Sequence, residues 1–143
     1  WLETTTLIIP GENDSDQELD KMTQWVVENL GSDVPMHFSA FHPDWKMKNI
    51  PATPHETLLR ARTIAMNNGV RYAYVGNVHD KTADSTWCHQ CGEILIGRYW
   101  YELSDWNLTA DGACKACGAK CAGIFDVKPG HWGARRLPVK LPI

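Results

Sequence analysis

The sequence predicts an α/β fold, in which a β-α-β-α-β unit is followed by a small subdomain built around four cysteines. Segments of strand and helix character alternate over residues 4–75, and two Cys-x-x-Cys-Gly motifs begin at Cys88 and Cys114. At 143 residues, with 43% hydrophobic residues, the chain can bury one modest core plus a small unit that is stabilised by a metal ion. We expect the α/β part over residues 1–82, the cysteine subdomain over 83–126 and a C-terminal tail over 127–143.

The first strand and the helix after it are indicated by residues 4–30. Residues 4–9 are β-branched and apolar without clear alternation, as in a strand that is buried on both faces. Ser15, with Glu18 three residues later, predicts a capping box at the start of a helix, and Gly31 supplies its C-terminal stop. The inner stripe of that helix recurs at helical spacing at Leu19, Met22, Val26 and Leu30.

A second strand, a second helix and a third strand follow in the same way. Residues 34–41 and 70–75 have strand character. Between them, Thr53 and Glu56 predict another capping box, with Pro54 at the first helical position and Gly69 as the stop. The inner stripe of this helix is predicted at Leu58, Ala61, Ile64 and Ala65.

Connections this short require parallel strands joined by right-handed crossovers. Three parallel strands do not cover both of their own faces, so this part is expected either to pair with another copy or to belong to a larger (β/α) barrel. In either arrangement, ligands gather at the carboxyl ends of the strands.

Residues with polar or metal-binding side chains follow all three strands at those ends. They are Gly11, Glu12, Asn13 and Asp14 after the first strand, His37, Ser39, His42 and Asp44 at the second, and Gly76, Asn77, His79 and Asp80 at the third. Each also has an ordinary structural interpretation as a turn, cap or core residue.

The cysteines predict a zinc ribbon. Cys88, Cys91, Cys114 and Cys117 form two pairs whose spacing lets both thiolates of a pair face one ion, and two such turns complete a tetrahedral four-sulfur shell. Gly92 and Gly118, one after each pair, let the backbone fold back so that N–H groups approach the sulfurs.

Other uses of these cysteines stay open at this point. A disulfide framework fits an odd count of five cysteines poorly, and a redox Cys-x-x-Cys would be needed twice. Iron in a rubredoxin-like site also accepts four thiolates. Cys121 is either a substitute ligand or a free thiol beside the second pair.

Aromatic residues are concentrated between the two pairs. Residues 94–103 are expected to form a strand or hairpin arm, and the chain is expected to return from Asp105. The aromatic side chains here either add to a very small hydrophobic core, which is the interpretation we favour, or form a surface on which a partner docks. The tail is expected to run along a surface, with Arg135 and Arg136 as solvated charges.

The charge balance argues against nucleic acid as a partner, because the formal net charge is −3 and nucleic-acid binders use basic surfaces to capture phosphates. No apolar run reaches the roughly 18 residues of a membrane span, and no basic-then-apolar leader opens the chain. We therefore expect no membrane association and a reducing, cytoplasmic location. The chain begins with Trp1, almost directly at a strand, which indicates a fragment or a chain whose N-terminal part is missing.

Several motifs in order resemble the C-terminal half of radical SAM enzymes. These are residues 7–14 (LIIPGEND), 34–38 (VPMHF), 42–47 (HPDWKM), 53–54 (TP), 74–78 (YVGNV), the paired C-x-x-C-G turns and residues 130–133 (GHWG). The closest resemblance is to pyruvate formate-lyase activating enzymes and, among these, to the radical SAM member of the AmmeMemoRadiSam system. The likeness runs across nearly the whole chain.

This resemblance implies a partial (β/α) barrel, to which the chain contributes the last strands. It implies S-adenosylmethionine and a 4Fe-4S cluster as cofactors of the full-length parent, although the family's C-x-x-x-C-x-x-C cluster motif does not occur in this sequence. By resemblance, His37 approaches the bound S-adenosylmethionine, Asn13 and Asp14 match a family turn, and Gly76 and Asn77 offer hydrogen bonds to cofactor or substrate.

Three functional interpretations follow. The one we favour is the C-terminal portion of a radical SAM enzyme with a structural zinc ribbon, which is inactive alone and has Memo-type and AMME-type proteins as partners. The second is a stand-alone zinc-ribbon module that binds a protein. The third is one half of a split enzyme, with the missing barrel half supplied by a second chain.

Overall fold

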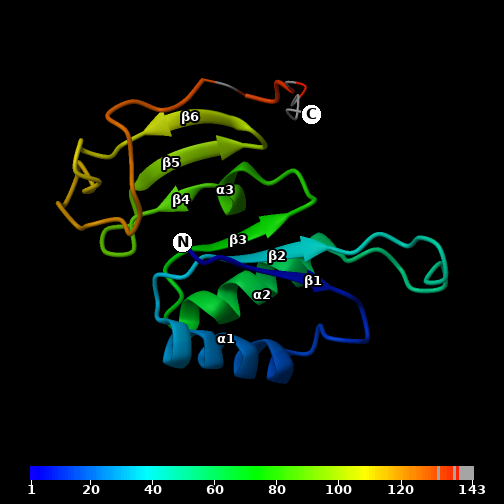
Figure 1. Cartoon of the computed structure of the whole chain (residues 1–143). Coiled ribbons are helices and arrows are strands. Elements are labelled where there is room, and N and C mark those ends of the chain that lie inside the picture. Colours follow the sequence, from blue (N-terminus) through cyan, green and yellow to red (C-terminus); the bar gives the residue numbers. More distant parts are fainter. Residues whose placement is uncertain (132, 137, 139–143) are drawn as a thin grey trace, which may run out of the picture.

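The computed structural model describes residues 1–131, 133–136 and 138 of the chain. It confirms a mixed α/β fold, with one three-stranded sheet in the order β1-β2-β3 and a second in the order β4-β5-β6. In sequence order the elements are β1 (Thr4–Ile8), α1 (Asp16–Leu30), β2 (Met36–Ala40), α2 (His55–Asn67), β3 (Ala73–Gly76), α3 (Lys81–Asp84), β4 (Thr86–Trp87), β5 (Ile94–Tyr99) and β6 (Glu102–Trp106). Figure 1 shows α1 and α2 on one side of the first sheet and the second sheet on the other side.

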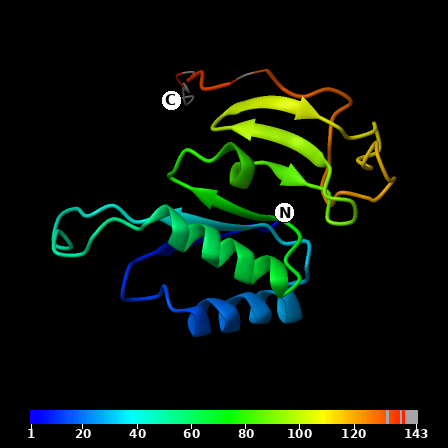
Figure 2. The ribbon, with the colours of Figure 1, turned by 180° about the vertical axis from the view of Figure 1, so that it is seen from behind.

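The first sheet is parallel throughout, as the sequence predicted. Thr5 of β1 lies opposite His37 of β2, which in turn lies opposite Tyr74 of β3. Because both crossovers are right-handed and step in the same direction, they place both helices on the same face of the sheet. The view from behind in Figure 2 shows the same layering.

One hydrophobic core fills the space between this sheet and its two helices. The helices contribute Leu19, Val26, Leu58, Ala61 and Ala65, and the strands contribute Ile8, Met36, Phe38, Ala73 and Val75. The strand residues in this core alternate along each strand, so the opposite face of the sheet carries a separate set of side chains.

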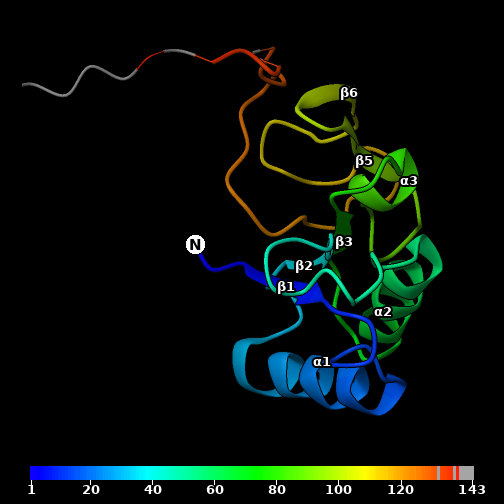
Figure 3. The same cartoon turned by 90° about the vertical axis from the view of Figure 1, so that its right-hand side faces the viewer.

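That opposite face, called the open face below, carries Thr5, Leu7, His37, Ser39 and Tyr74, and neither α1 nor α2 covers it. The prediction that the first strand is buried on both faces was wrong, because Thr5 is exposed and the Leu7 side chain is 44% exposed. Figure 3, turned to the side, shows α1 and α2 on one side of the sheet and α3 with the β4–β6 sheet on the other.

The two helices begin differently. Ser15 caps α1 as predicted, since its hydroxyl accepts a hydrogen bond from the Glu18 N–H. The capping box predicted at Thr53 does not form, because α2 begins after Pro54 without any side-chain cap. The Thr53 hydroxyl instead donates to the Ile8 carbonyl at 2.5 Å and accepts from the Phe41 N–H at 2.8 Å, and this ties together the carboxyl ends of two strands.

The second sheet is antiparallel and its hairpin turns earlier than predicted. β5 ends at Tyr99 and β6 begins at Glu102, so Trp100 and Tyr101 form the turn. The interpretation of the aromatic segment as core was wrong for the turn, because Tyr99 and Trp100 are each 48% exposed and Tyr101 is 68% exposed. Short helix α3 and strand β4, which connect the two sheets, were not predicted.

Within the described residues, every helix is too short or too polar to cross a membrane. The predicted tail over residues 127–143 lies partly outside the described residues, as does Trp132 in the motif at residues 130–133. The domain boundaries at residues 82 and 126 stay predictions.

A candidate four-cysteine metal centre and the adjoining cavity

The two cysteine pairs sit on turns with the same hydrogen-bond pattern. In the first, the Cys88 N–H donates to the Glu93 carbonyl and the Gly92 N–H donates back to the Cys88 carbonyl. In the second, the Cys114 N–H donates to the Ala119 carbonyl and the Gly118 N–H donates to the Cys114 carbonyl. Both glycines have positive φ, +74° for Gly92 and +78° for Gly118, a conformation in which an L side chain is strained. The prediction that the turn after each cysteine pair needs a glycine is therefore confirmed.

The two turns bring the four sulfurs together. The Sγ atoms of Cys88, Cys91, Cys114 and Cys117 all lie within 4.8 Å of one another. Across the two turns, Cys88 Sγ lies 3.6 Å from Cys117 Sγ, and Cys91 Sγ lies 3.8 Å from Cys114 Sγ. Tetrahedral coordination with metal–sulfur bonds of about 2.3 Å needs ligand sulfurs roughly this far apart, so the group can hold a metal ion.

The backbone favours the thiolate form at Cys88. Burial works against ionisation, but hydrogen bonds from the N–H groups of Cys91 and Gln90 outweigh it and lower the pKa of Cys88 to about 7. A thiolate is the form of cysteine that binds a metal ion. The donor set of four neighbouring sulfurs suits a thiophilic metal.

Cys121 lies outside this group, which settles the open alternative for that residue. It is buried in the small core of the second sheet together with Tyr72, Leu95 and Leu108. Burial raises the pKa of the Cys121 thiol, which keeps it protonated near neutral pH. Its role in the structure is that of a small core residue.

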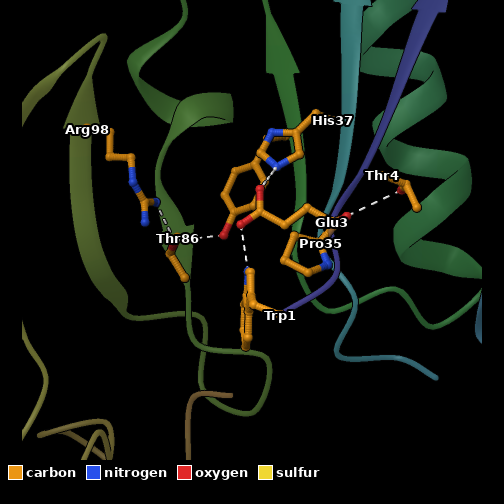
Figure 4. Close-up of polar contacts among 8 residues, drawn as sticks. Trp1, Glu3, Thr4, Pro35, His37, Thr86 and Arg98 are labelled. Carbon is orange, nitrogen blue, oxygen red and sulfur yellow. Dashed lines mark hydrogen bonds and ion pairs between the residues drawn. The ribbon is translucent and has the colours of Figure 1, made fainter. Parts of the chain in front are cut away.

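A cavity of about 830 Å³ lies between the open face of the first sheet and the β4–β6 sheet. Residues from both sheets and from their connections line it, and they include Glu3, His37, Tyr74, Thr86, Arg98 and Trp100. Figure 4 shows the polar contacts on its two sides, with Arg98 and Thr86 facing the group formed by Trp1, Glu3 and His37.

On the side of the first sheet, Glu3 and His37 form a contact pair. His37 Nε2 lies 3.0 Å from Glu3 Oε2, and the Trp1 indole N–H donates to Glu3 Oε1 at 2.7 Å. These hydrogen bonds, the one from Trp1 foremost, lower the pKa of Glu3 and hold it as a carboxylate. The His37 ring also stacks on the Tyr74 ring, with 5.1 Å between centroids. The imidazole is thereby fixed in orientation from two directions.

His37 is the second residue of β2, so it lies near the amino end of the strand rather than at its carboxyl end. It therefore does not share a rim with the loops that follow β1 and β3. The alternation along β2 places it on the open face instead, where it lines the cavity.

Asn13 and Asp14 close the turn after β1. Asn13 Oδ1 accepts from the Ile9 N–H and its Nδ2 donates to the Leu7 carbonyl, while Asp14 Oδ1 accepts from the Gly11 N–H. Both side chains are thus used in stabilising the turn.

Gly76 and Asn77 line the cavity at the end of β3. A Cβ on Gly76 would lie 2.9 Å from the Ser39 hydroxyl oxygen, so a side chain at this position would require the Ser39 side chain to move. Asn77 adopts a φ of +61° and donates from Nδ2 to the Ala40 carbonyl. The remaining polar residues at this edge have local roles: His79 accepts from the Trp100 indole, and Asp80 caps α3 and contacts His55.

Sequence reasoning missed Glu3, Tyr74, Thr86 and Arg98 as cavity residues. Alternation along β1, β2 and β3 puts Glu3, His37 and Tyr74 on one face, and that signal was available in the sequence. Nothing in the sequence placed Thr86 and Arg98 opposite them, because the meeting of the two sheets is a long-range event.

Comparisons with known proteins give one informative match. A protein of Methanocaldococcus jannaschii, named uncharacterized protein MJ0808, is 42% identical over 121 residues, which are 84% of this chain. The chain spans 36% of the length of that curated relative. No family model matches the chain, and no solved structure matches it. The chain is therefore similar to one part of a longer archaeal protein.

Proposed function

We propose that this chain is the C-terminal portion of a radical SAM enzyme of the activating-enzyme type, carrying a structural zinc ribbon. The observation that carries the proposal is the arrangement of the first sheet. Its strands run in the order β1-β2-β3 with both helices on one face, which is the winding of a (β/α) barrel. A doubly wound sheet would carry helices on both faces.

Two further features support a partial barrel. β1 is an edge strand with a free side in the described part of the chain, so another strand can pair there. The open face carries polar and half-buried side chains such as His37 and Ser39, as expected of a surface that lines a site. A relative of which this chain spans 36% is consistent with a longer parent protein.

The metal we propose is zinc in a structural role. All four positions of the site are supplied by cysteine sulfur, which leaves no open position for water or substrate. Zinc is the common occupant of closed four-cysteine sites on paired turns, and iron is the competing occupant.

For the parent enzyme we propose His37 as a residue that contacts S-adenosylmethionine. It lines the cavity, and its ring is held by Glu3 and Tyr74. In such enzymes a 4Fe-4S cluster supplies the electron for cleaving the cofactor. Because this sequence has no C-x-x-x-C-x-x-C motif, the chain alone is not expected to cleave S-adenosylmethionine.

A second candidate is a stand-alone zinc-ribbon module that docks on a protein. The observation in its favour is the exposed aromatic turn formed by Tyr99, Trp100 and Tyr101. Such a module would need no barrel partner. A split enzyme, in which a second chain supplies the missing barrel half, would combine both features. Memo-type and AMME-type partners and a cytoplasmic location remain part of the main proposal.

The test of the main proposal uses a longer protein that contains this chain and its upstream sequence. That protein is purified without oxygen, supplied with iron and sulfide, and assayed for 5′-deoxyadenosine formed from S-adenosylmethionine under dithionite. The expected result is deoxyadenosine from the long protein and none from this chain alone. An upstream sequence without a three-cysteine cluster motif, or a reconstituted long protein that forms no deoxyadenosine, contradicts the proposal.

Metal analysis of this chain tests the ribbon separately. About one zinc per chain with no visible absorption supports a structural zinc site. Iron, with the visible colour of thiolate-bound iron, would overturn zinc as the occupant and would leave the barrel proposal untouched.

A further inference from the structure

The cavity between the two sheets contains a cation, Arg98, that forms no close ion pair with any of the described residues. Arg98 projects from β5 toward the cavity, and its Nη1 donates to the Thr86 hydroxyl. The Tyr74 hydroxyl also interacts with the guanidinium, and among the described residues no carboxylate lies within 4.0 Å of it. A guanidinium has five N–H donors and stays charged at any physiological pH. Most of its donors are therefore free to bind a ligand.

The neighbours of Arg98 hold it in place rather than neutralise it. Thr86 is buried, and its hydroxyl lies 2.8 Å from the Tyr74 hydroxyl, so Tyr74, Thr86 and Arg98 form a continuous chain of hydrogen bonds. The Arg98 guanidinium carbon also lies 5.6 Å from the centre of the Tyr74 ring. A guanidinium fixed over an aromatic ring presents its remaining N–H groups in a defined direction.

Two carboxylates on the cavity wall, Glu3 and Asp84, attract Arg98 through their charge, but neither lies within 4.0 Å of its guanidinium. Glu3 already interacts with His37 and Trp1 on the opposite side. Asp84 is half-buried, and burial foremost raises the pKa of its carboxyl. An oxyanion that enters the cavity would therefore meet Arg98 as an available partner.

The rest of the wall suits a flat, apolar group. Tyr74, Trp100, Tyr101 and Phe125 all line the cavity. The Trp100 ring is held by its hydrogen bond of 2.7 Å to His79 Nδ1, so this wall is formed before any ligand arrives. Aromatic walls with one or two fixed polar groups are typical of small-molecule sites.

We propose that this cavity binds a planar organic ligand that carries an oxyanion group, carboxylate or phosphate, which Arg98 holds in a bidentate contact while the aromatic residues contact the ring. A guanidinium matches both groups because its paired N–H donors fit two oxygens at once. The proposed function places S-adenosylmethionine at His37 in this same cavity, but the present inference is argued from Arg98 and the aromatic wall and is tested on this chain alone.

The test is an amide chemical-shift titration of the zinc-loaded chain with three probes of similar size: benzoate, phenyl phosphate and neutral benzyl alcohol. The expected result is saturable shifts at residues 74, 86 and 98 with one or both anions, and binding of benzyl alcohol weaker by about tenfold or more. The ratio of the affinities for benzoate and phenyl phosphate tells which oxyanion the site prefers.

Four variants make the test specific. Arg98→Gln should weaken anion binding by about tenfold. Arg98→Lys should retain part of the anion affinity, because the charge remains but the paired N–H donors of the guanidinium are lost. Tyr101→Ala, at an exposed position that carries little risk to folding, should weaken it by about threefold. Arg60→Gln removes an equally charged side chain on the helical face of the first sheet and should change nothing.

Three results would overturn the proposal. They are the absence of saturable shifts with both anions, an affinity for benzyl alcohol equal to that for the anions, or binding that survives unchanged in Arg98→Lys and Tyr101→Ala. A folded Arg98→Gln variant that binds as well as the parent chain would also overturn it.

Discussion

The hydroxyl oxygen of Tyr72 accepts a hydrogen bond of 2.9 Å from the backbone N–H of Ala122, which lies 50 residues further along the chain. Tyr72 directly precedes β3, and Ala122 follows the second cysteine turn. The contact therefore joins the first sheet to the part of the chain that carries the four-cysteine group. Burial, as the main cause, raises the pKa of the Tyr72 hydroxyl, so it stays protonated at neutral pH.

Tyr72→Phe should reduce the free energy of unfolding by about 1–2 kcal/mol, because the Ala122 N–H loses its partner in a buried place. Urea unfolding followed by circular dichroism measures this. Tyr101→Phe, which removes the same hydroxyl from a side chain that is 68% exposed, serves as the matched control and should have no measurable effect. Equal losses in the two variants would show that the Tyr72–Ala122 contact contributes nothing.

Removing the metal should unfold the cysteine subdomain before the first sheet. The core around the cysteine turns is small, and a closed metal site supplies folding free energy to such units. Adding a strong chelator should release about one zinc per chain and abolish the near-ultraviolet signal of Trp106, while the helical signal from α1 and α2 remains. Unchanged near-ultraviolet and helical signals after complete metal loss would contradict a structural role.

Cys117→Ser should lose the metal, whereas Cys121→Ser should retain it. Cys117 belongs to the group of four sulfurs within 4.8 Å, and Cys121 does not. Each substitution replaces one sulfur atom with oxygen. Comparing the two variants therefore separates the loss of a metal ligand from the general effect of losing a thiol. Zinc content measured by elemental mass spectrometry gives the result. Zinc loss in Cys121→Ser to the same extent would mean that Cys121 ligates the ion.

Thr53→Val should destabilise the chain by about 2 kcal/mol. The Thr53 hydroxyl satisfies both the Phe41 N–H and the Ile8 carbonyl, and valine of the same shape leaves both buried groups unpaired. Thr63→Val is the control, since the Thr63 hydroxyl only donates to the Leu59 carbonyl within the exposed side of α2. Urea unfolding should separate the two variants clearly. A loss at Thr53 no larger than that at Thr63 would contradict this role.

The carboxylate of Asp80 should make a pH-dependent contribution to stability. Burial works to raise the pKa of Asp80, but hydrogen bonds from the Ala83 N–H and from His55 outweigh it and hold the pKa below the usual 3.8. A lowered native pKa means that the contribution is present above the unfolded pKa and is lost as the pH falls through the native value.

Asp80→Asn keeps a good N-cap for α3 and removes only the charge. The parent chain should therefore be more stable than this variant by up to about 1 kcal/mol at pH 5–6, and the difference should shrink as the pH falls below 3.8. Because both proteins share the cysteine site, metal release in acid cancels in the comparison. A difference that stays constant down to pH 2 would contradict the lowered pKa.

Local signals predicted a large part of this fold. The capping interaction at Ser15, the glycine stops and the two Cys-x-x-Cys-Gly turns each depend on residues within a few positions of one another. The spacing that predicts the cysteine turns also forces their geometry, since Gly92 and Gly118 adopt the positive φ that the turn requires. The parallel direction of the first three strands followed from the short connections between them.

Where distant groups compete for the same side chain, the sequence predicted the wrong contact. Thr53 has the spacing of a capping residue, yet its hydroxyl binds to the Ile8 carbonyl at the end of β1 and to the Phe41 N–H just after β2. The aromatic turn at Trp100 and Tyr101 was predicted as core, but the hairpin reverses there and exposes it.

The sequence by itself determined the succession of strands and helices in the first sheet and the pairing of the four cysteines, because each depends on short-range spacing. Only the tertiary structure decided that Arg98 and Thr86 face Glu3 and His37 across a cavity. That arrangement depends on how two sheets pack, and packing is set by the shapes of many side chains that are far apart in the sequence. The candidate ligand site therefore became visible only once the two sheets were placed together.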